Sequence, residues 1–220
     1  MARLRNLFQY KKFRLYLGWL LALDAFCFVP TRSSLLLGAL FFIVLGESLR
    51  VWASGSIVKS KILSVSGPYR FVRNPLYLGS FLIGIGFTLL LWQPFLFILY
   101  LFFFWFFYWG TIQKEEESLK ENFGDPYRLY LRHVPRLFPR LVPYREKGSR
   151  SFRFRQVFEN GETITLLTIL FVLFLLHVKR ALERERPFER KDLLIGGAAL
   201  LVGIEIFREV IQRRLKEAEK

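Results

Sequence analysis

The 220-residue chain predicts an all-α, polytopic transmembrane protein with a four-helix core and a C-terminal helical hairpin. Hydrophobic residues make up 53% of the chain and the mean hydropathy is +0.28, although 23% of the residues are charged. These values fit together only if charged and apolar residues are segregated, and apolar runs do alternate with short basic stretches. This layout disfavours a soluble enzyme, a disordered chain and a secreted disulfide scaffold.

Six apolar segments are expected to form the helices. The first follows a basic N-terminus that resembles a signal peptide, but no small-residue cleavage site comes after it, so we expect a transmembrane helix. The fourth is rich in Phe and apolar all round, which favours a lipid-embedded helix. Most are short of the ~20 residues of a full span, so their ends should extend into flanking residues. The segments are 15–29, 34–49, 76–92, 94–112, 162–178 and 193–207.

The distribution of Lys and Arg predicts the orientation. A cytoplasmic N-terminus places 21 basic residues on the inner side through the fourth segment and leaves Arg32 alone outside. We therefore expect an integral protein of a bacterial inner membrane, or an equivalent one, with a cytoplasmic N-terminus. The last two segments fit less well because the connector 179–192 carries six basic residues. Two spans are expected there, and a peripheral or re-entrant hairpin is the alternative.

The net charge of +15 predicts contact with anionic membrane lipids, and no nucleic-acid partner is expected. The single cysteine, Cys27, cannot form an internal disulfide. The sequence has no Cys/His cluster, so no metal site is expected.

A minimal connection joins the third and fourth segments. Helices linked only by Gln93–Pro94 must run antiparallel, so 76–112 is expected to be a helical hairpin whose open ends both face the cytoplasm. The polar stretches 64–74 and 114–139 adjoin those ends. They should therefore meet in space.

The first of these stretches reads Ser-Gly-Pro-Tyr-Arg-Phe-Val-Arg-Asn-Pro-Leu-Tyr-Leu-Gly over residues 66–79. Its Gly-Pro pair predicts a turn, and Asn74-Pro75 predicts a helix start with Asn as the cap. The N–H groups of such a helix end favour an anion. Residues that could converge there are Tyr69, Arg70, Arg73 and Tyr77. The alternative is that they are ordinary anchors at the inner membrane boundary.

The second stretch begins with three carboxylates, Glu115 to Glu117, directly after the Phe-rich segment. Acidic groups near the hydrocarbon are costly without partners. The hairpin geometry predicts that they pair with Arg70 or Arg73.

Together the two motifs resemble the isoprenylcysteine carboxyl methyltransferase family, and the wider group of membrane phospholipid methyltransferases, over residues 35–143. Residues 49–53, Leu-Arg-Val-Trp-Ala, also resemble the end of that family's preceding helix. The resemblance implies an integral membrane methyltransferase of the EC 2.1.1 class that uses S-adenosylmethionine bound on the cytoplasmic side. The cofactor-binding residues that it implies are Gly67, Pro68, Tyr69, Arg73, Asn74, Pro75, Tyr77, Glu115 and Glu116. Many relatives have His at the position of Asn74, so an acid–base role there is in doubt.

A lipophilic methyl acceptor is expected to enter from the bilayer. Methyl transfer needs alignment and a preorganised site, and an Arg suits an anionic head group. The expected catalytic residues are Glu116, Arg132 and Arg136, with Arg128 as a further candidate for the head group. An isoprenylcysteine-type carboxylate is favoured as acceptor. The alternatives are a phospholipid amine, an NADPH-dependent sterol or enone reductase, and a non-catalytic lipid-binding protein.

The sequence divides into a methyltransferase core, 1–147, and a C-terminal extension, 148–220, with two transmembrane helices. A homodimer through that hairpin is one expected role for it. The basic stretch 149–155 predicts a linker that few packing contacts cross.

The charge distribution predicts the labelling of single cysteines in a Cys27→Ser background. Cysteines at Lys59 and Arg145 should react only from the cytoplasmic side, and one at Arg32 only from outside, because 21 of 22 basic residues fall on one side. Labelling by a membrane-impermeant maleimide measures this. Reaction of the Arg145 position from outside would contradict both the orientation and the expected cofactor side.

Overall fold

The computed structural model describes residues 35–57, 63–144 and 151–183. These residues form helices and no strand, so the all-α class is confirmed for them. The predicted segments 15–29 and 193–207 lie outside the described residues. In chain order the elements are α2 (Leu36–Ser56), the 3₁₀ helix η1 (Gly67–Arg70), α3 (Pro75–Leu91), α4 (Pro94–Phe123), α5 (Asp125–His133), α6 (Phe154–Glu159) and α7 (Glu162–Glu183).

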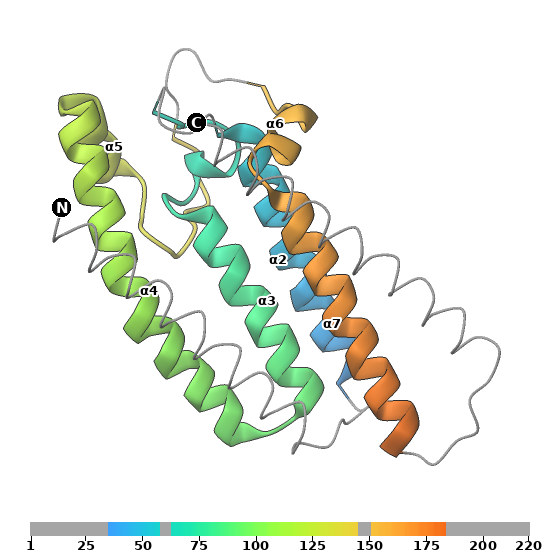
Figure 1. Ribbon diagram of the computed structural model, residues 1–220. Helices are drawn as coiled ribbons and strands as arrows, with labels where there is room; N and C mark the ends of the chain where they lie inside the picture. The colour runs from blue at the N-terminus through green and yellow to red at the C-terminus, as the bar shows by residue number, and fades with distance from the viewer. Residues whose placement is uncertain (1–34, 58–62, 145–150, 184–220) are drawn as a thin grey trace, which may run out of the picture.

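Three of these helices are long and apolar enough to cross a membrane: α2, α4 and the first 19 residues of α7. The shorter apolar helix α3 lies among them (Figure 1). These helices are those of an integral membrane protein. As expected, helix ends extend beyond the apolar runs into flanking residues: α2 continues to Ser56 and α4 to Phe123. A helix satisfies its own backbone groups, so it can continue through polar residues beyond the apolar run.

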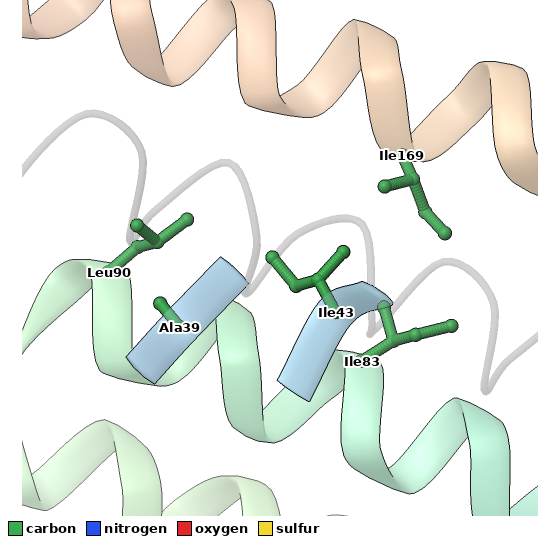
Figure 2. Close-up of a cluster of buried hydrophobic side chains, with 5 residues drawn as sticks. All are labelled: Ala39, Ile43, Ile83, Leu90 and Ile169. Atoms are coloured by element: carbon green, nitrogen blue, oxygen red, sulfur yellow. The ribbon is translucent and has the colours of Figure 1, made fainter. Parts of the chain in front are cut away.

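Glycines let α2 and α3 touch along their backbones. A Cβ on Gly46 would lie 2.6 Å from the carbonyl oxygen of Gly79, and one on Gly86 would lie 2.7 Å from that of Ala39. Beside these contacts, apolar side chains of α2, α3 and α7 form a buried cluster (Figure 2). Its members are Ala39, Ile43, Ile83, Leu90 and Ile169. Small residues thus hold α3 against α2, as expected for helices in lipid.

The antiparallel hairpin of α3 and α4 is confirmed (Figure 1). Trp92 ends α3 with a left-handed φ of 45°, and Pro94 occupies the first turn of α4. The hydroxyl of Tyr100 on α4 donates to the carbonyl of Phe81 on α3 at 3.0 Å. The Tyr100 ring lies against Gly84. The lack of a side chain at Gly84 lets α4 pack closely against α3, and the lack of one at Gly86 does the same for α2. The hairpin delivers the start of α3 and the end of α4 to the same end of the molecule.

The expectation that few contacts cross the linker at 149–155 is wrong for the residues described. The backbone N–H of Arg153 donates to the carbonyl of Gly55 at 3.0 Å, and the ring of Phe152 covers the same glycine. The side-chain amide of Asn160 donates to the carbonyls of Ser54 and Ile57 at 2.8 and 3.1 Å. Helix ends leave carbonyls without partners, and here the extension supplies donors to the end of α2. The domain boundary at 147 and the homodimer remain predictions.

The close approach of α2 and α3 predicts the effect of adding one methyl group. Gly46→Ala should lower the free energy of unfolding by about 1–3 kcal/mol, because the new Cβ meets the α3 backbone. Gly38→Ala in the same helix is the control, since nothing lies within 4 Å of its Cβ. That change should be neutral or stabilise by up to about 1 kcal/mol. Thermal unfolding in detergent measures both, and equal effects would contradict the packing described.

Candidate functional site

The two polar stretches meet at one end of the helices, as predicted. The chain after α5 passes between the ends of α4 and α3 (Figure 1). It is fixed there by backbone hydrogen bonds of 2.9 Å from Arg73 N–H to the carbonyl of Pro135 and 3.0 Å from Arg140 N–H to that of Phe71. Residues 42 and 62 positions apart in sequence thus form one structure.

At its centre, the carboxylate of Glu116 binds two guanidinium groups. Arg136 donates from Nη2 to Oε2 at 2.7 Å and from Nε to both oxygens at 3.1 and 3.2 Å. Nη1 of Arg73 lies 3.3 Å from Oε1. The predicted pairing of Glu116 with Arg73 is thus present, whereas Arg70 donates instead to the carbonyl of Tyr144 at 2.9 Å. We call Glu116, Arg73, Arg136 and Asn74 the Glu116 group.

This group carries more positive than negative charge. Only 5% of the Glu116 side chain is exposed, against 13% for Arg73 and 27% for Arg136, so water screens the three charges weakly. Among the described residues, Nε of Arg73 is buried with no hydrogen-bond partner. The Arg136 guanidinium also lies over the ring of Trp109, 4.6 Å from its centroid. One carboxylate therefore orders two cations, which together remain able to bind an anion.

Asn74 occupies the predicted N-cap position of α3, but its side chain does not cap the helix. Its amide instead donates to Oε1 of Glu116 at 3.2 Å and to the carbonyl of Arg136 at 3.1 Å. The prediction of a capping side chain is therefore wrong. The amide joins the start of α3 to the Glu116 group.

Glu115 lies one residue before Glu116 but is exposed. Tyr77 on α3 donates a 2.8 Å hydrogen bond from its hydroxyl to Oε1 of Glu115. This contact places a second carboxylate beside the first turn of α3, close in sequence to the Glu116 group but open to solvent.

Three buried tyrosines lie in η1 and α5, the elements that adjoin the site. The hydroxyl of Tyr130 donates to the carbonyl of Tyr69 at 2.7 Å and ties α5 to η1. Burial raises the pKa of the Tyr69, Tyr127 and Tyr130 hydroxyls well above the usual range, so all three stay protonated at neutral pH. Tyr130 is the hydrogen-bond donor of the three, and all three rings are buried.

The other predicted site residues fall into two sets. Pro68, Tyr69 and Pro75 are buried, and Gly67 adopts a φ of +56° against the side chain of Ser56. These residues shape η1 and the start of α3. Arg128 is exposed and pairs with Asp125 at 3.3 Å, and Arg132 is exposed and joins no ion pair within the described ranges. The structure thus brings Arg136, and not Arg128 or Arg132, to the Glu116 group.

Sequence reasoning missed Trp109 and the supporting role of Tyr127 and Tyr130. The spacing of these residues along their helices would have indicated that they lie on the inward face. Trp109, Ile112 and Glu116 are related as i, i+3 and i+7 and so share one face of α4. Tyr127, Tyr130 and Val134 have the same spacing, and all three are buried.

Comparison with known proteins agrees with the motifs. Residues 33–126 match the sequence model of the phospholipid methyltransferase family. The chain is 37% identical over 117 residues to the protein-S-isoprenylcysteine O-methyltransferase of Schizosaccharomyces pombe, a match covering 48% of this chain and 49% of that protein. For the enzymes of that name from Saccharomyces cerevisiae and Homo sapiens the values are 34% over 118 residues (48% and 49%) and 32% over 112 residues (46% and 39%). No solved structure matches.

The segment that spans α2, α3 and α4 therefore has the sequence features of a phospholipid methyltransferase-type membrane domain. Within that class, the relatives named above are isoprenylcysteine methyltransferases. The resemblance predicted from the two motifs is confirmed. The matched part covers half or less of the length of these relatives. Arg136 lies beyond the matched range 33–126.

The Glu116 group predicts a large difference between neighbouring glutamates. Glu116→Gln should lower the free energy of unfolding by about 3 kcal/mol, because two weakly solvated guanidinium groups lose their carboxylate. Glu117→Gln is the matched control, since its exposed pair with Lys120 should contribute less than about 0.5 kcal/mol. Thermal unfolding in detergent distinguishes them. A loss for Glu116→Gln no larger than that of the control would contradict the assigned pairing.

Proposed function

We propose that this protein transfers a methyl group from S-adenosylmethionine to a lipophilic acceptor held in the membrane, and that the acceptor group is an isoprenylcysteine-type carboxylate. The observation that carries the proposal is the Glu116 group, a buried carboxylate with two ordered guanidiniums in a membrane domain matching a methyltransferase family. The names of the relatives support the choice of acceptor.

The chemistry of the described side chains suits this methyl donor. S-adenosylmethionine presents a carboxylate, an ammonium group and a sulfonium. The guanidinium of Arg73, whose side chain is 13% exposed, is of the right type to hold a carboxylate, and the net charge of the Glu116 group favours an anion. Glu115, exposed and oriented by Tyr77, suits a cation. We therefore assign Arg73, Asn74, Tyr77 and Glu115 to the donor, while Gly67, Pro68, Tyr69 and Pro75 shape the turn beneath it.

The acceptor is assigned to Arg136. Glu116 and the Trp109 ring together fix the guanidinium of Arg136, so it is preorganised to hold a carboxylate at the membrane boundary. When bound, S-adenosylmethionine supplies an electrophilic methyl group, and the protein's task is to align the acceptor oxygen and exclude water. Arg132 is exposed at the end of α5 and would at most attract anionic head groups.

The protonation of the site favours a carboxylate over a phospholipid amine. Asn74 carries a neutral amide that cannot take a proton. An ammonium must lose a proton before it accepts a methyl group, whereas a carboxylate is already deprotonated at neutral pH. A carboxylate acceptor therefore requires no proton transfer at Asn74.

The site is proposed to face the cytoplasm, with the N-terminus on the same side. The support is the clustering of basic residues at this end of the helices, including Arg70, Arg73, Arg136 and Arg140.

Donor binding by the purified full chain tests the proposal. S-adenosylmethionine should bind and NADPH should not. Glu115→Gln should weaken S-adenosylmethionine binding by about tenfold, because a charge-assisted contact contributes about 1.5 kcal/mol. Glu117→Gln should leave the affinity unchanged, since Glu117 pairs with Lys120 on the exposed surface. Isothermal titration calorimetry in detergent gives all four values.

Acceptor choice is tested with tritiated S-adenosylmethionine. Methyl groups should pass to an S-farnesylcysteine with a free carboxylate, and not to its amide or to phosphatidylethanolamine. Labelled phosphatidylethanolamine would contradict the assigned acceptor while keeping the methyltransferase class. Binding of NADPH without S-adenosylmethionine would overturn the class and favour the reductase.

A further inference from the structure

A second buried ion-pair cluster lies apart from the Glu116 group, where α2, α3 and α7 meet. Its centre is Arg50 on α2, whose Nε donates to Oε1 of Glu162 on α7 at 2.6 Å. Nη2 donates to the hydroxyl of Thr165 on α7 at 3.2 Å. Only 5% of the Glu162 side chain and 17% of the Arg50 side chain are exposed. The C-terminal extension therefore supplies the carboxylate that neutralises a buried guanidinium of the core.

The third nitrogen of Arg50 reaches the first turns of α3. Nη1 donates to the hydroxyl of Ser80 at 2.5 Å and to the carbonyl of Leu76 at 3.3 Å. Leu76 is the neighbour of Tyr77, and Asn74 immediately precedes the same helix. One guanidinium thus links α7 to the turn of α3 that presents two residues of the proposed donor site.

Glu47 is a second carboxylate near Arg50, and it competes with Glu162 for the same guanidinium. Its Oε2 lies 4.0 Å from Nε of Arg50, yet within the described parts of the chain neither of its carboxylate oxygens has a hydrogen-bond partner. Two carboxylates therefore flank one guanidinium, and Glu162 holds the short contact. If Glu162 lost its charge, Glu47 would be the remaining carboxylate described near Nε of Arg50, and the guanidinium would lose the contact that ties it to α7.

We propose that Glu162 is a positioning residue for the methyl-donor site: through Arg50 it fixes the first turns of α3, and with them Asn74 and Tyr77. The extension is then part of the enzyme's working core. A core truncated at 147 would retain the site residues but lose the carboxylate that orders Arg50. This inference rests on the proposed function, because the residues that it positions are assigned to the donor there.

The test compares two glutamates of the extension in the full-length protein. Glu162→Gln should raise the dissociation constant for S-adenosylmethionine by about threefold to tenfold, part of the effect of one charged hydrogen bond. The rate at saturating donor should change by less than about twofold, because none of the hydrogen bonds described for Arg50 involves the Glu116–Arg136 ion pair. Glu159→Gln is the control, since Glu159 pairs with Arg155 on the exposed surface of α6. Glu162→Asp keeps the charge and should recover most of the affinity.

A second variant keeps the test decisive if Glu162→Gln does not fold. Ser80→Ala removes the link at its other end and should weaken donor binding in the same way. Where both single variants fold, their effects should not add, because each interrupts the same connection. Wild-type affinity in Glu162→Gln or Ser80→Ala, or an equal loss in Glu159→Gln, would overturn the positioning role and leave the proposed function standing. Failure of the unaltered protein to bind S-adenosylmethionine would overturn both.

Discussion

The pairing of one buried carboxylate with two guanidinium groups determines the shape of this end of the molecule. Glu116 comes from the end of α4, Arg73 from the turn before α3, and Arg136 from the chain after α5. A carboxylate near the hydrocarbon is costly without partners, and so is an unpaired guanidinium. The helical hairpin, the return of the chain across η1 and the exposure of Glu115 are all compatible with this pairing. The second cation leaves the Glu116 group with a net positive charge.

The sequence predicted the features that depend on local rules. The Gln93–Pro94 connection required an antiparallel hairpin, and the start of α3 at Pro75 follows from a residue suited to the first helical turn. Which of three consecutive glutamates is buried depends on the rotation of α4. Successive side chains on a helix point about 100° apart, so only Glu116 shares a face with Trp109 and Ile112. The apolar run alone did not fix that rotation, but the spacing of its inward residues would have.

The sequence alone could not show which of several similar arginines would pair with a residue far away in the chain. Arg70 and Arg73 lie in one motif, and Arg128, Arg132 and Arg136 follow one another at helical spacing. Tertiary contacts decide between them: Tyr144 accepts from Arg70, and α5 turns Arg128 and Arg132 outward. The same limit explains Asn74, whose amide leaves the cap for Glu116 and Arg136. Nothing local in the chain indicated that Arg50 and Glu162, 112 residues apart, would pair.

The capping of α2 by the extension has a consequence for biosynthesis. The carbonyls of Ser54 and Ile57 receive the amide of Asn160, which is 106 and 103 residues further along the chain. At a synthesis rate of about 5–20 residues per second, the last turn of α2 waits about 5–20 seconds for this partner. During that interval Arg50 also lacks its partner Glu162. Water or lipid head groups at the membrane boundary must then solvate the Arg50 guanidinium and the carbonyls at the end of α2. The end of α2 therefore gains the partners that the structure describes for it, Asn160 and Glu162, only after the start of α7 has been synthesised.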